Sequence, residues 1–297
     1  MRTSRGDCRA SRLPDRAGAL ASSAGCRRSR LTVSNPYDDL APEYDKWITG
    51  DPACVPTVKF YLGWLAQAVG RIVEGGVGTG RIAIELARRN QLVTGIDISA
   101  PMLSIARDRA RLLGPECTLS LCQMDLLRLG LRSVDFFILP FRTIGHFVSH
   151  DERLQVFNQI FGSLAPGGRF VFDHYVPDLA WARENHCRPL RMFTEEAGAV
   201  RLEIWDTYEF DFARSLLNCA VDVVRNRRSS EASELHEPSR RTVAFTFSWL
   251  APDEVRELAA VTGFDVEAHY GDFNEGPFNA QSEQQIWVLR RPLGRGP

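Results

Sequence analysis

Lysine is almost absent from this chain of 297 residues. Lys46 and Lys59 are the only lysines among 36 basic residues, so the other 34 are arginines, a bias better explained by a GC-rich bacterial genome than by chemistry. No run of apolar residues approaches the roughly 18 that a transmembrane helix needs. None of the seven cysteines forms a C-x-x-C pair and no secretory apolar segment is present, so we expect reduced thiols in a cytoplasmic protein.

A strong charge of one sign is also missing, because the net charge is −1. Residues 1–32 carry eight arginines and two aspartates, which leaves a net charge of −7 on the remainder. A net-acidic body binds polyphosphates poorly, so we expect no nucleic-acid partner. We also expect no membrane partner. The apolar fraction of 44% is ample for one large packed domain.

The most informative segment reads Val-Glu-Gly-Gly-Val-Gly-Thr-Gly, and it lies between an expected strand and an expected helix. Three glycines, Gly76, Gly78 and Gly80, follow Glu74, and glycine suits a backbone that turns sharply or approaches a ligand closely. A dinucleotide fingerprint would need another glycine at the position of Arg81. The observed E-x-G-x-G-x-G pattern instead resembles motif I of the class I S-adenosylmethionine-dependent methyltransferases.

Four further segments resemble that family in the same order along the chain. Asp97 closes the next expected strand, where an acidic side chain is placed to accept ribose hydroxyls. Residues 121–126, 134–141 and 164–173 are similar to the adenine-contacting motif, the strand that ends at the active site, and the helix–turn–strand after it. The ordered set spans roughly residues 35 to 175.

The resemblance implies S-adenosylmethionine as cofactor and assigns roles residue by residue. Asp97 would bind the ribose, Met102 would pack on the adenine, and Asp125 would face its exocyclic amine. The full set of expected cofactor residues is Tyr37, Glu74, Gly75, Gly76, Gly78, Gly80, Arg81, Asp97, Ile98, Met102, Met124, Asp125, Leu126 and Leu139.

The hydrophobic pattern predicts an α/β fold with a doubly wound, mainly parallel, seven-stranded sheet. Expected strands at 71–74, 92–96, 117–122, 134–139 and 169–173 alternate with helices at 80–89, 100–113 and 151–164, after a first helix at 53–69. A helix at 252–262 and strands at 264–270 and 285–290 complete the expected sheet. Period-two patterns around Val200–Ile204 and Val243–Phe247 predict a small antiparallel β cover at about 185–250, inserted after the fifth strand, with a charged loop at 225–241.

The loop after the expected fourth strand supplies the candidate catalytic residue. His146 is the preferred general base because the pKa of histidine lies near neutral pH, and the alternative is that it only orients the loop. His146 and His150 are spaced to share a metal, but Leu139-Pro140 stands where metal-dependent relatives carry an aspartate. We therefore predict transfer without a metal.

Other candidates come from segments that reach the same end of the sheet. Tyr37 and Tyr44 would fold over the cofactor, and Tyr44 is the second catalytic candidate. Expected substrate contacts are Phe141, Arg142, His174, Tyr175 and Phe273, with Phe278 as an alternative wall.

The sequence predicts a methyltransferase acting on a small molecule, with N-methylation favoured and natural-product biosynthesis as one setting. O- or C-methylation of an aromatic metabolite stays open, as do a catalytically silent, cofactor-binding partner subunit and a homodimer. Residues 1–32 are expected to be disordered, a transit peptide, or not native protein, since translation from Val33 would give a start that resembles the family. The methyltransferase domain would then span 33–297.

Overall fold

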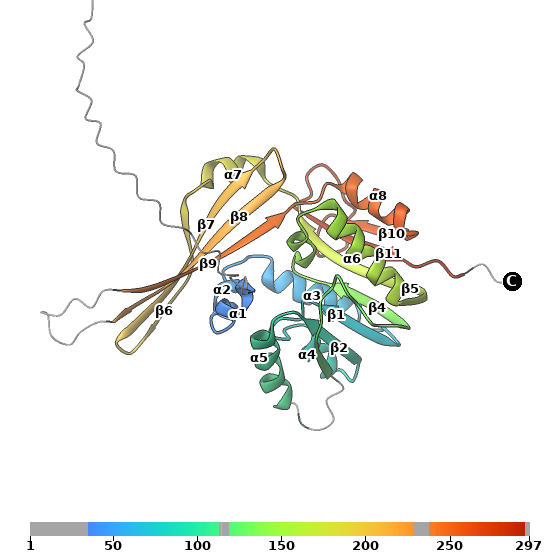
Figure 1. The fold of residues 1–297 in the computed structure, drawn as a ribbon, viewed down its shortest axis with the longest axis horizontal. Helices are drawn as coiled ribbons and strands as arrows, with labels where there is room; N and C mark the ends of the chain where they lie inside the picture. The colour runs from blue at the N-terminus through green and yellow to red at the C-terminus, as the bar shows by residue number, and fades with distance from the viewer. Residues whose placement is uncertain (1–34, 113, 115–118, 228–237, 295–297) are drawn as a thin grey trace, which may run out of the picture. The chain divides into compact units, whose positions relative to one another are not determined.

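The computed structural model describes residues 35–112, 114, 119–227 and 238–294 (Figure 1). The chain divides into two units, Met1–Val33 and Ser34–Pro297, and all described residues belong to the second. The expectations for residues 1–32 and for the charged tip at 228–237 lie outside the described residues.

The second unit is built on a seven-stranded sheet in the order β3-β2-β1-β4-β5-β11-β10. Its strands are β1 Arg71–Gly75, β2 Leu92–Asp97, β3 Leu119–Gln123, β4 Val134–Leu139, β5 Leu164–Tyr175, β10 Asp265–Tyr270 and β11 Gln284–Arg290. Strand β11 runs antiparallel to β5 and β10, and the remaining neighbours are parallel. The predicted mainly parallel seven-stranded sheet is confirmed.

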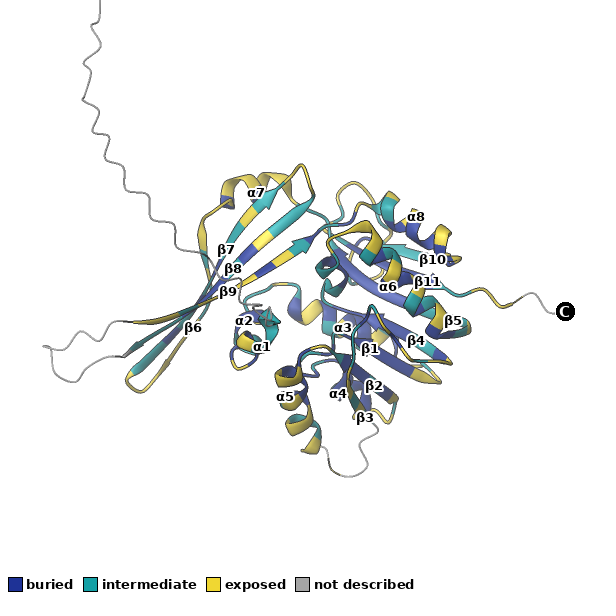
Figure 2. Cartoon of the chain, in the orientation of Figure 1, coloured by how far each residue is buried: buried dark blue, intermediate teal, exposed yellow. Residues whose placement is uncertain are grey.

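Helices cover both faces of this sheet and bury separate cores. Helices α6 His150–Ser163 and α8 Pro252–Thr262 pack on one face, where Val73 and Phe137 point. Helices α3 Cys54–Trp64, α4 Ala83–Ala87 and α5 Ala100–Arg111 pack on the other face, where Ile72 and Ile138 point. Because both faces are covered, the central strands are buried along most of their length (Figure 2).

A second, four-stranded antiparallel sheet forms the cover, with strands β6 Pro189–Ala197, β7 Val200–Asp211, β8 Leu216–Arg227 and β9 Ser239–Ser248. Helix α7 Leu179–Asn185 leads into it. In β7 and β9, more buried residues alternate with more exposed ones. The cover lies where the sequence predicted it, but α7, β6 and β8 were not individually predicted.

The first two helices, α1 Pro36–Leu40 and α2 Tyr44–Ile48, connect the cover to the central sheet (Figure 1). Leu40 and Trp47 are buried against β7, β8 and β9. Buried Glu43 forms ion pairs with Arg225 on β8 and Arg241 on β9. The predicted loop at 225–241 is wrong at both ends, because β8 continues to Arg227 and β9 begins at Ser239. The ion pairs with Glu43 hold both of these strand ends.

Several boundaries also differ from the prediction. The first turn after Gly80 is not regular helix, and α4 starts only at Ala83, because Gly80 has φ +84°. Helix α6 begins at His150, not Asp151, because Ser149 and Glu152 form a capping box one residue earlier. Leu164 has an extended backbone and pairs with Val134, so β5 starts five residues before the predicted strand.

Candidate active site

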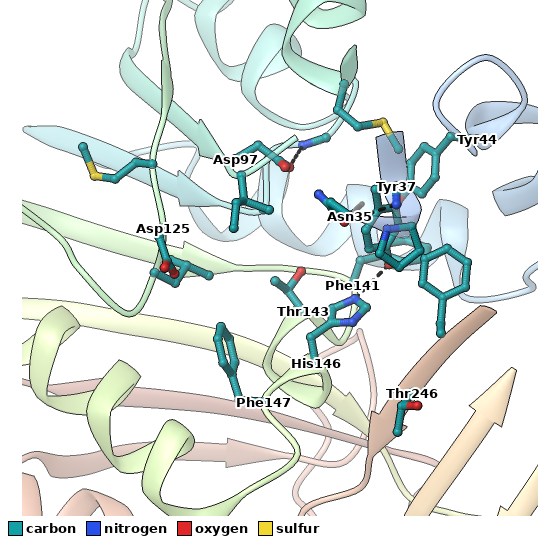
Figure 3. Close-up of a pocket in the computed structure, with 18 of the residues that line it drawn as sticks. Asn35, Tyr37, Tyr44, Asp97, Asp125, Phe141, Thr143, His146, Phe147 and Thr246 are labelled. Atoms are coloured by element: carbon teal, nitrogen blue, oxygen red, sulfur yellow. Dashed lines mark hydrogen bonds between the residues drawn. The ribbon is translucent and has the colours of Figure 1, made fainter. Parts of the chain in front are cut away.

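A cavity of about 300 Å³, the cofactor cavity, opens at the carboxyl ends of β1, β2 and β4 (Figure 3). Ligands bind at this edge in open α/β sheets because the loops there are free to form a crevice. The residues lining it are Asn35, Pro36, Tyr37, Tyr44, Gly76, Gly78, Asp97, Ile98, Met102, Met124, Asp125, Leu126, Phe141, Thr143, His146, Phe147, Ala244, Phe245 and Thr246. Eleven of these were predicted as cofactor or catalytic residues.

Asp97 shapes the glycine loop directly. One carboxylate oxygen accepts a hydrogen bond from the Gly78 amide, and the other accepts one from the Ser99 amide, both at 2.8 Å. Each oxygen retains a second lone pair for a ligand hydroxyl. Burial raises the pKa of Asp97 above its usual range, while these two amides oppose the shift.

The glycines of the loop have left-handed backbones that favour glycine. Gly76 has φ +64° and Gly78 has φ +54°. A Cβ on Gly76 would lie 2.8 Å from the Thr143 side chain, whereas a Cβ on Gly78 would approach no atom closer than 3.9 Å. A side chain at Gly78 would therefore extend into open space next to Tyr44, which lines the same cavity.

Glu74 supplies a second acidic group beside the loop. Its side chain is buried, and its Oε2 atom has no hydrogen-bond partner. Burial raises the pKa of Glu74 to about 8, against the opposing effects of the Ala83 amide and Arg81. Glu74, Arg81 and Thr79 line a small hollow of about 30 Å³ next to Gly76. An unpaired buried carboxyl group suits the amino group of S-adenosylmethionine, and Arg81 offers a cation for its carboxylate, so the residues present fit the cofactor.

A larger cavity of about 430 Å³, the acceptor cavity, lies between the loops after β4 and β5, helices α2 and α7, and the cover. Tyr37, Tyr44 and Phe141 line both cavities. The other lining residues are Trp47, Ile48, Gly50, Asp51, Pro52, Arg142, His174, Tyr175, Pro177, Asp178, Trp181, Ala182, Leu190, Met192, Asp206, Tyr208, Phe210, Leu217, Cys219 and Phe247. Three aromatic rings therefore form the boundary between the two cavities.

His146 lies on the cofactor side of this boundary, in the short helix η1 Thr143–His146. Its Nε2 atom is 2.8 Å from the Tyr37 hydroxyl, and a dashed line marks this hydrogen bond in the close-up (Figure 3). Burial lowers the pKa of His146 to about 4 and raises the pKa of Tyr37 well above its usual value. The expectation of a near-neutral His146 pKa is wrong, because the ring is buried and packs against Phe247.

The loop after β4 has an unusual backbone. Phe141 and Arg142 both have left-handed φ, at +61° and +60°. The buried Asp173 carboxylate accepts hydrogen bonds from the Phe141 amide at 2.9 Å, the Arg142 amide at 3.2 Å and the Tyr61 hydroxyl at 2.8 Å. Burial raises the pKa of Asp173, and its hydrogen-bond donors oppose the shift. Asp173 holds the aromatic boundary in place, a role that the sequence did not suggest.

The predicted substrate residues separate into two groups. Arg142, His174 and Tyr175 line the acceptor cavity, but Arg142 is ion-paired with Asp51 at 2.6 Å and is not a free cation. Burial lowers the pKa of His174 to about 3 and raises the pKa of Tyr175 to about 12, so both are neutral. Phe273 instead packs near Phe60 of α3, with ring centroids 6.1 Å apart, so its prediction as a wall is wrong.

Three predicted cofactor residues, Gly75, Gly80 and Leu139, pack in the core and line neither cavity. Leu139 is fully buried among apolar side chains, and a Cβ on Gly75 would lie 2.9 Å from Leu139 and Leu126. Gly80 lies against Ile84 and Ala106. Phe278, the alternative wall, stacks on His269 with centroids 4.0 Å apart.

Within the described ranges, no group of three or more histidine, cysteine or acidic side chains is arranged to hold a metal ion. His146 contacts Tyr37, whereas the exposed His150 side chain lies 3.6 Å from Glu254. Across the described part of the chain, every helix is too short or too polar to span a bilayer.

Comparison with known proteins finds methyltransferases. Residues 72–168 match the family described as a methyltransferase domain. Over 259 residues the chain is 25% identical to a "Putative methyltransferase" of Geobacillus sp. (strain WCH70), covering 86% of this chain and 99% of that protein.

Solved structures share the fold over most of the chain. The CcbJ methyltransferase from Streptomyces caelestis superposes with a TM-score of 0.70 at 22% identity, covering 86% of this chain and 98% of that chain. The sugar N-methyltransferase KedS8 from Streptoalloteichus superposes with a TM-score of 0.64 at 14% identity, covering 94% of this chain and 100% of that chain. The family match, the relative and the order of the strands support a class I S-adenosylmethionine-dependent methyltransferase, and the solved structures show that the chain shares their fold.

Proposed function

We propose that this enzyme methylates a nitrogen atom of a small molecule held in the acceptor cavity. The observation that carries the proposal is the meeting of two cavities at Tyr37, Tyr44 and Phe141. One cavity is lined by the motif residues that suit S-adenosylmethionine. The other is enclosed by the cover and has room for a small molecule but not for a folded polymer.

The protein's main contribution is alignment. S-adenosylmethionine, when bound, supplies a methyl group on a positively charged sulfur that is already a good leaving group. Asp97 would hold the ribose end, and Glu74 with Arg81 would hold the amino acid end. The three boundary rings would exclude water and keep the nucleophile in line with the methyl group, which lowers the barrier through positioning.

Tyr37 is the polar group best placed to contact the acceptor. Its hydroxyl lies at the boundary, its raised pKa keeps it protonated, and it shares a hydrogen bond with neutral His146 whose direction is set by the His146 tautomer. The Tyr37 oxygen retains a lone pair that can accept an N–H from the acceptor and orient its nitrogen. His146 thus acts through Tyr37 as a positioning residue, since a pKa of about 4 makes it a poor base for an ammonium group.

Transfer to nitrogen without a metal is supported by the chemistry of the lining. A neutral amine attacks through its own lone pair and needs neither a strong base nor a Lewis acid. The opposite charges of Asp51 and Arg142 cancel in their ion pair. Asp178 and Asp206 then give the lining of the acceptor cavity a net negative formal charge. KedS8, which shares the fold, is a sugar N-methyltransferase. Natural-product biosynthesis fits a cavity of this size and aromatic content.

The test is turnover with matched acceptors. Purified enzyme with S-adenosylmethionine would be offered small amines and their hydroxyl counterparts, and products would be detected by mass spectrometry. We expect a mass gain of one methyl group on amines only, unchanged by EDTA. Methylation of phenols alone would favour O-transfer, and cofactor binding without any turnover would favour a silent partner subunit.

A further inference from the structure

Asp206 is a buried carboxylate in the wall of the acceptor cavity, on β7. The residue is 1% exposed. One oxygen accepts a hydrogen bond from the Trp47 indole at 2.8 Å, and the other accepts one from the Tyr208 hydroxyl at 2.6 Å. Each oxygen therefore has one lone pair left for another donor.

The charge of Asp206 has no counter-ion in the described part of the chain. Both of its hydrogen-bond donors are neutral, because indole does not ionise and burial together with Asp206 raises the pKa of Tyr208. Burial raises the pKa of Asp206 only to about 6, so the group is ionised at neutral pH. Buried charges in proteins are almost always paired, so this carboxylate calls for a cation.

The other charged groups of the cavity do not provide that cation. Arg142 is committed to Asp51 through two hydrogen bonds. Asp178 caps α7 by accepting hydrogen bonds from the Ala180 and Trp181 amides, and it adds a second negative charge. The formal charges of the lining groups therefore sum to a negative value.

Aromatic rings surround the carboxylate on the cavity side. Tyr208 lies 5.9 Å from Trp181 and 6.2 Å from Phe210, measured between ring centroids. Trp47 and Phe247 complete the aromatic lining. A carboxylate among aromatic faces attracts an ammonium group through both its charge and the ring quadrupoles.

We propose that Asp206 binds an ammonium group of the acceptor, distinct from the neutral nitrogen that attacks the methyl group, so the substrates are small amines with a second, cationic nitrogen and an apolar or aromatic body. This inference rests on the proposed function and makes Asp206 a specificity-determining residue. Neutral or anionic molecules of the same shape would leave the buried charge unpaired and would bind more weakly.

A further pair of polar groups faces the same cavity. His174 is 1% exposed, and both of its ring nitrogens lack a hydrogen bond of normal geometry, although the Ser248 carbonyl lies nearby. The buried Tyr175 hydroxyl also has no partner. Both groups are neutral, so they suit a hydroxyl or carbonyl group on the acceptor and not a second charge.

The experiment uses three probes of nearly equal size, namely benzylamine, benzyl alcohol and benzoate. Their affinities would be measured by ligand-observed NMR at neutral pH on the full chain saturated with S-adenosylhomocysteine. We expect benzylamine to bind wild type about tenfold or more tightly than either of the others. The preference should disappear in Asp206→Asn and persist in Tyr208→Phe, which keeps the charge, and in Glu209→Gln, an exposed control on the same strand.

Equal binding of the three probes to wild type, or a preference that survives in folded Asp206→Asn, would overturn the inference. If Asp206→Asn does not fold, the wild-type selectivity decides the question. Calorimetry with S-adenosylhomocysteine distinguishes failure of the Asp206 role from failure of the proposed function. Normal cofactor binding without amine preference refutes only the role of Asp206, whereas absent cofactor binding refutes the proposed function.

Discussion

Replacing Asp173 with alanine removes the group that fixes the boundary between the two cavities. The carboxylate accepts hydrogen bonds from Tyr61 and from two consecutive amides, those of Phe141 and Arg142. Both loop residues adopt a left-handed backbone that costs roughly 1–3 kcal/mol each for a residue other than glycine. Without Asp173 we expect the loop to relax and Phe141 to leave its place between the cavities.

The magnitude follows from the groups left without partners. The Tyr61 hydroxyl is fully buried, and an unsatisfied donor there costs about 1–3 kcal/mol. The two amides are partly accessible and would recover part of their loss by relaxing towards water. We therefore expect a loss of roughly 2–4 kcal/mol in the free energy of unfolding. The melting temperature should fall by roughly 5–15 °C.

Two assays distinguish this role from simple destabilisation. Thermal unfolding gives the stability change, and calorimetry gives the affinity for S-adenosylhomocysteine, which should fall about tenfold. Tyr61→Phe is the matched control, because it removes one hydrogen bond to Asp173 and leaves both loop amides bonded. It should cost ~1 kcal/mol and leave affinity near wild type. Asp173→Ala behaving like Tyr61→Phe in both assays would refute a loop-fixing role.

Further predictions concern protons and the chain start. Because burial raises the Glu74 pKa to about 8, the group is protonated at neutral pH, and a cofactor ammonium beside it should displace that proton. Calorimetry of cofactor binding in buffers of different ionisation enthalpy should show proton release by wild type that Glu74→Gln abolishes. The affinity of wild type for the cofactor should rise towards pH 8. Equal proton release by wild type and Glu74→Gln would contradict this. With a His146 pKa of about 4, the pH profile of kcat should show no inflection near pH 6.5. His146→Asn should lower kcat by less than ~10²-fold, which is the smallest loss expected when a general base is removed. An inflection in the wild-type profile that His146→Asn removes would restore His146 as the base. A chain starting at Val33, with methionine in its place, should keep its melting temperature, and a large loss would show that residues 1–32 are structural.

The predicted site residues that the structure brings together at one cavity are those encoded locally in the sequence. The glycine loop and Asp97 follow buried strands directly, and parallel strands bring such positions to one edge of the sheet whatever the rest of the chain does. Their chemistry is determined by a few neighbouring residues. The loop after β4 was located for the same reason.

The parts missed or predicted wrongly depend on contacts between distant segments. Asp173 and Tyr61 are 112 residues apart, and Asp206 and Trp47 are 159 residues apart. No local pattern records such pairs. The pKa of His146 was misjudged because its burial comes from Tyr37 and Phe247, and Phe273 was misplaced because an apolar loop residue is equally able to pack on a helix.

The central claim is that the motif I loop and Asp97 form the cofactor site, and calorimetry with S-adenosylhomocysteine tests it most directly. Wild type should bind one molecule per chain. Asp97→Ala should weaken binding by ~1.5–3 kcal/mol, the range for hydrogen bonds to a charged group. Gly78→Val should abolish it, because φ of +54° is strained for valine and the added side chain would extend into the open space next to Tyr44, which lines the same cavity. Asp108→Ala, an exposed change on α5, should bind normally. Unchanged affinity in both Asp97→Ala and Gly78→Val would contradict the assignment of this cavity to the cofactor.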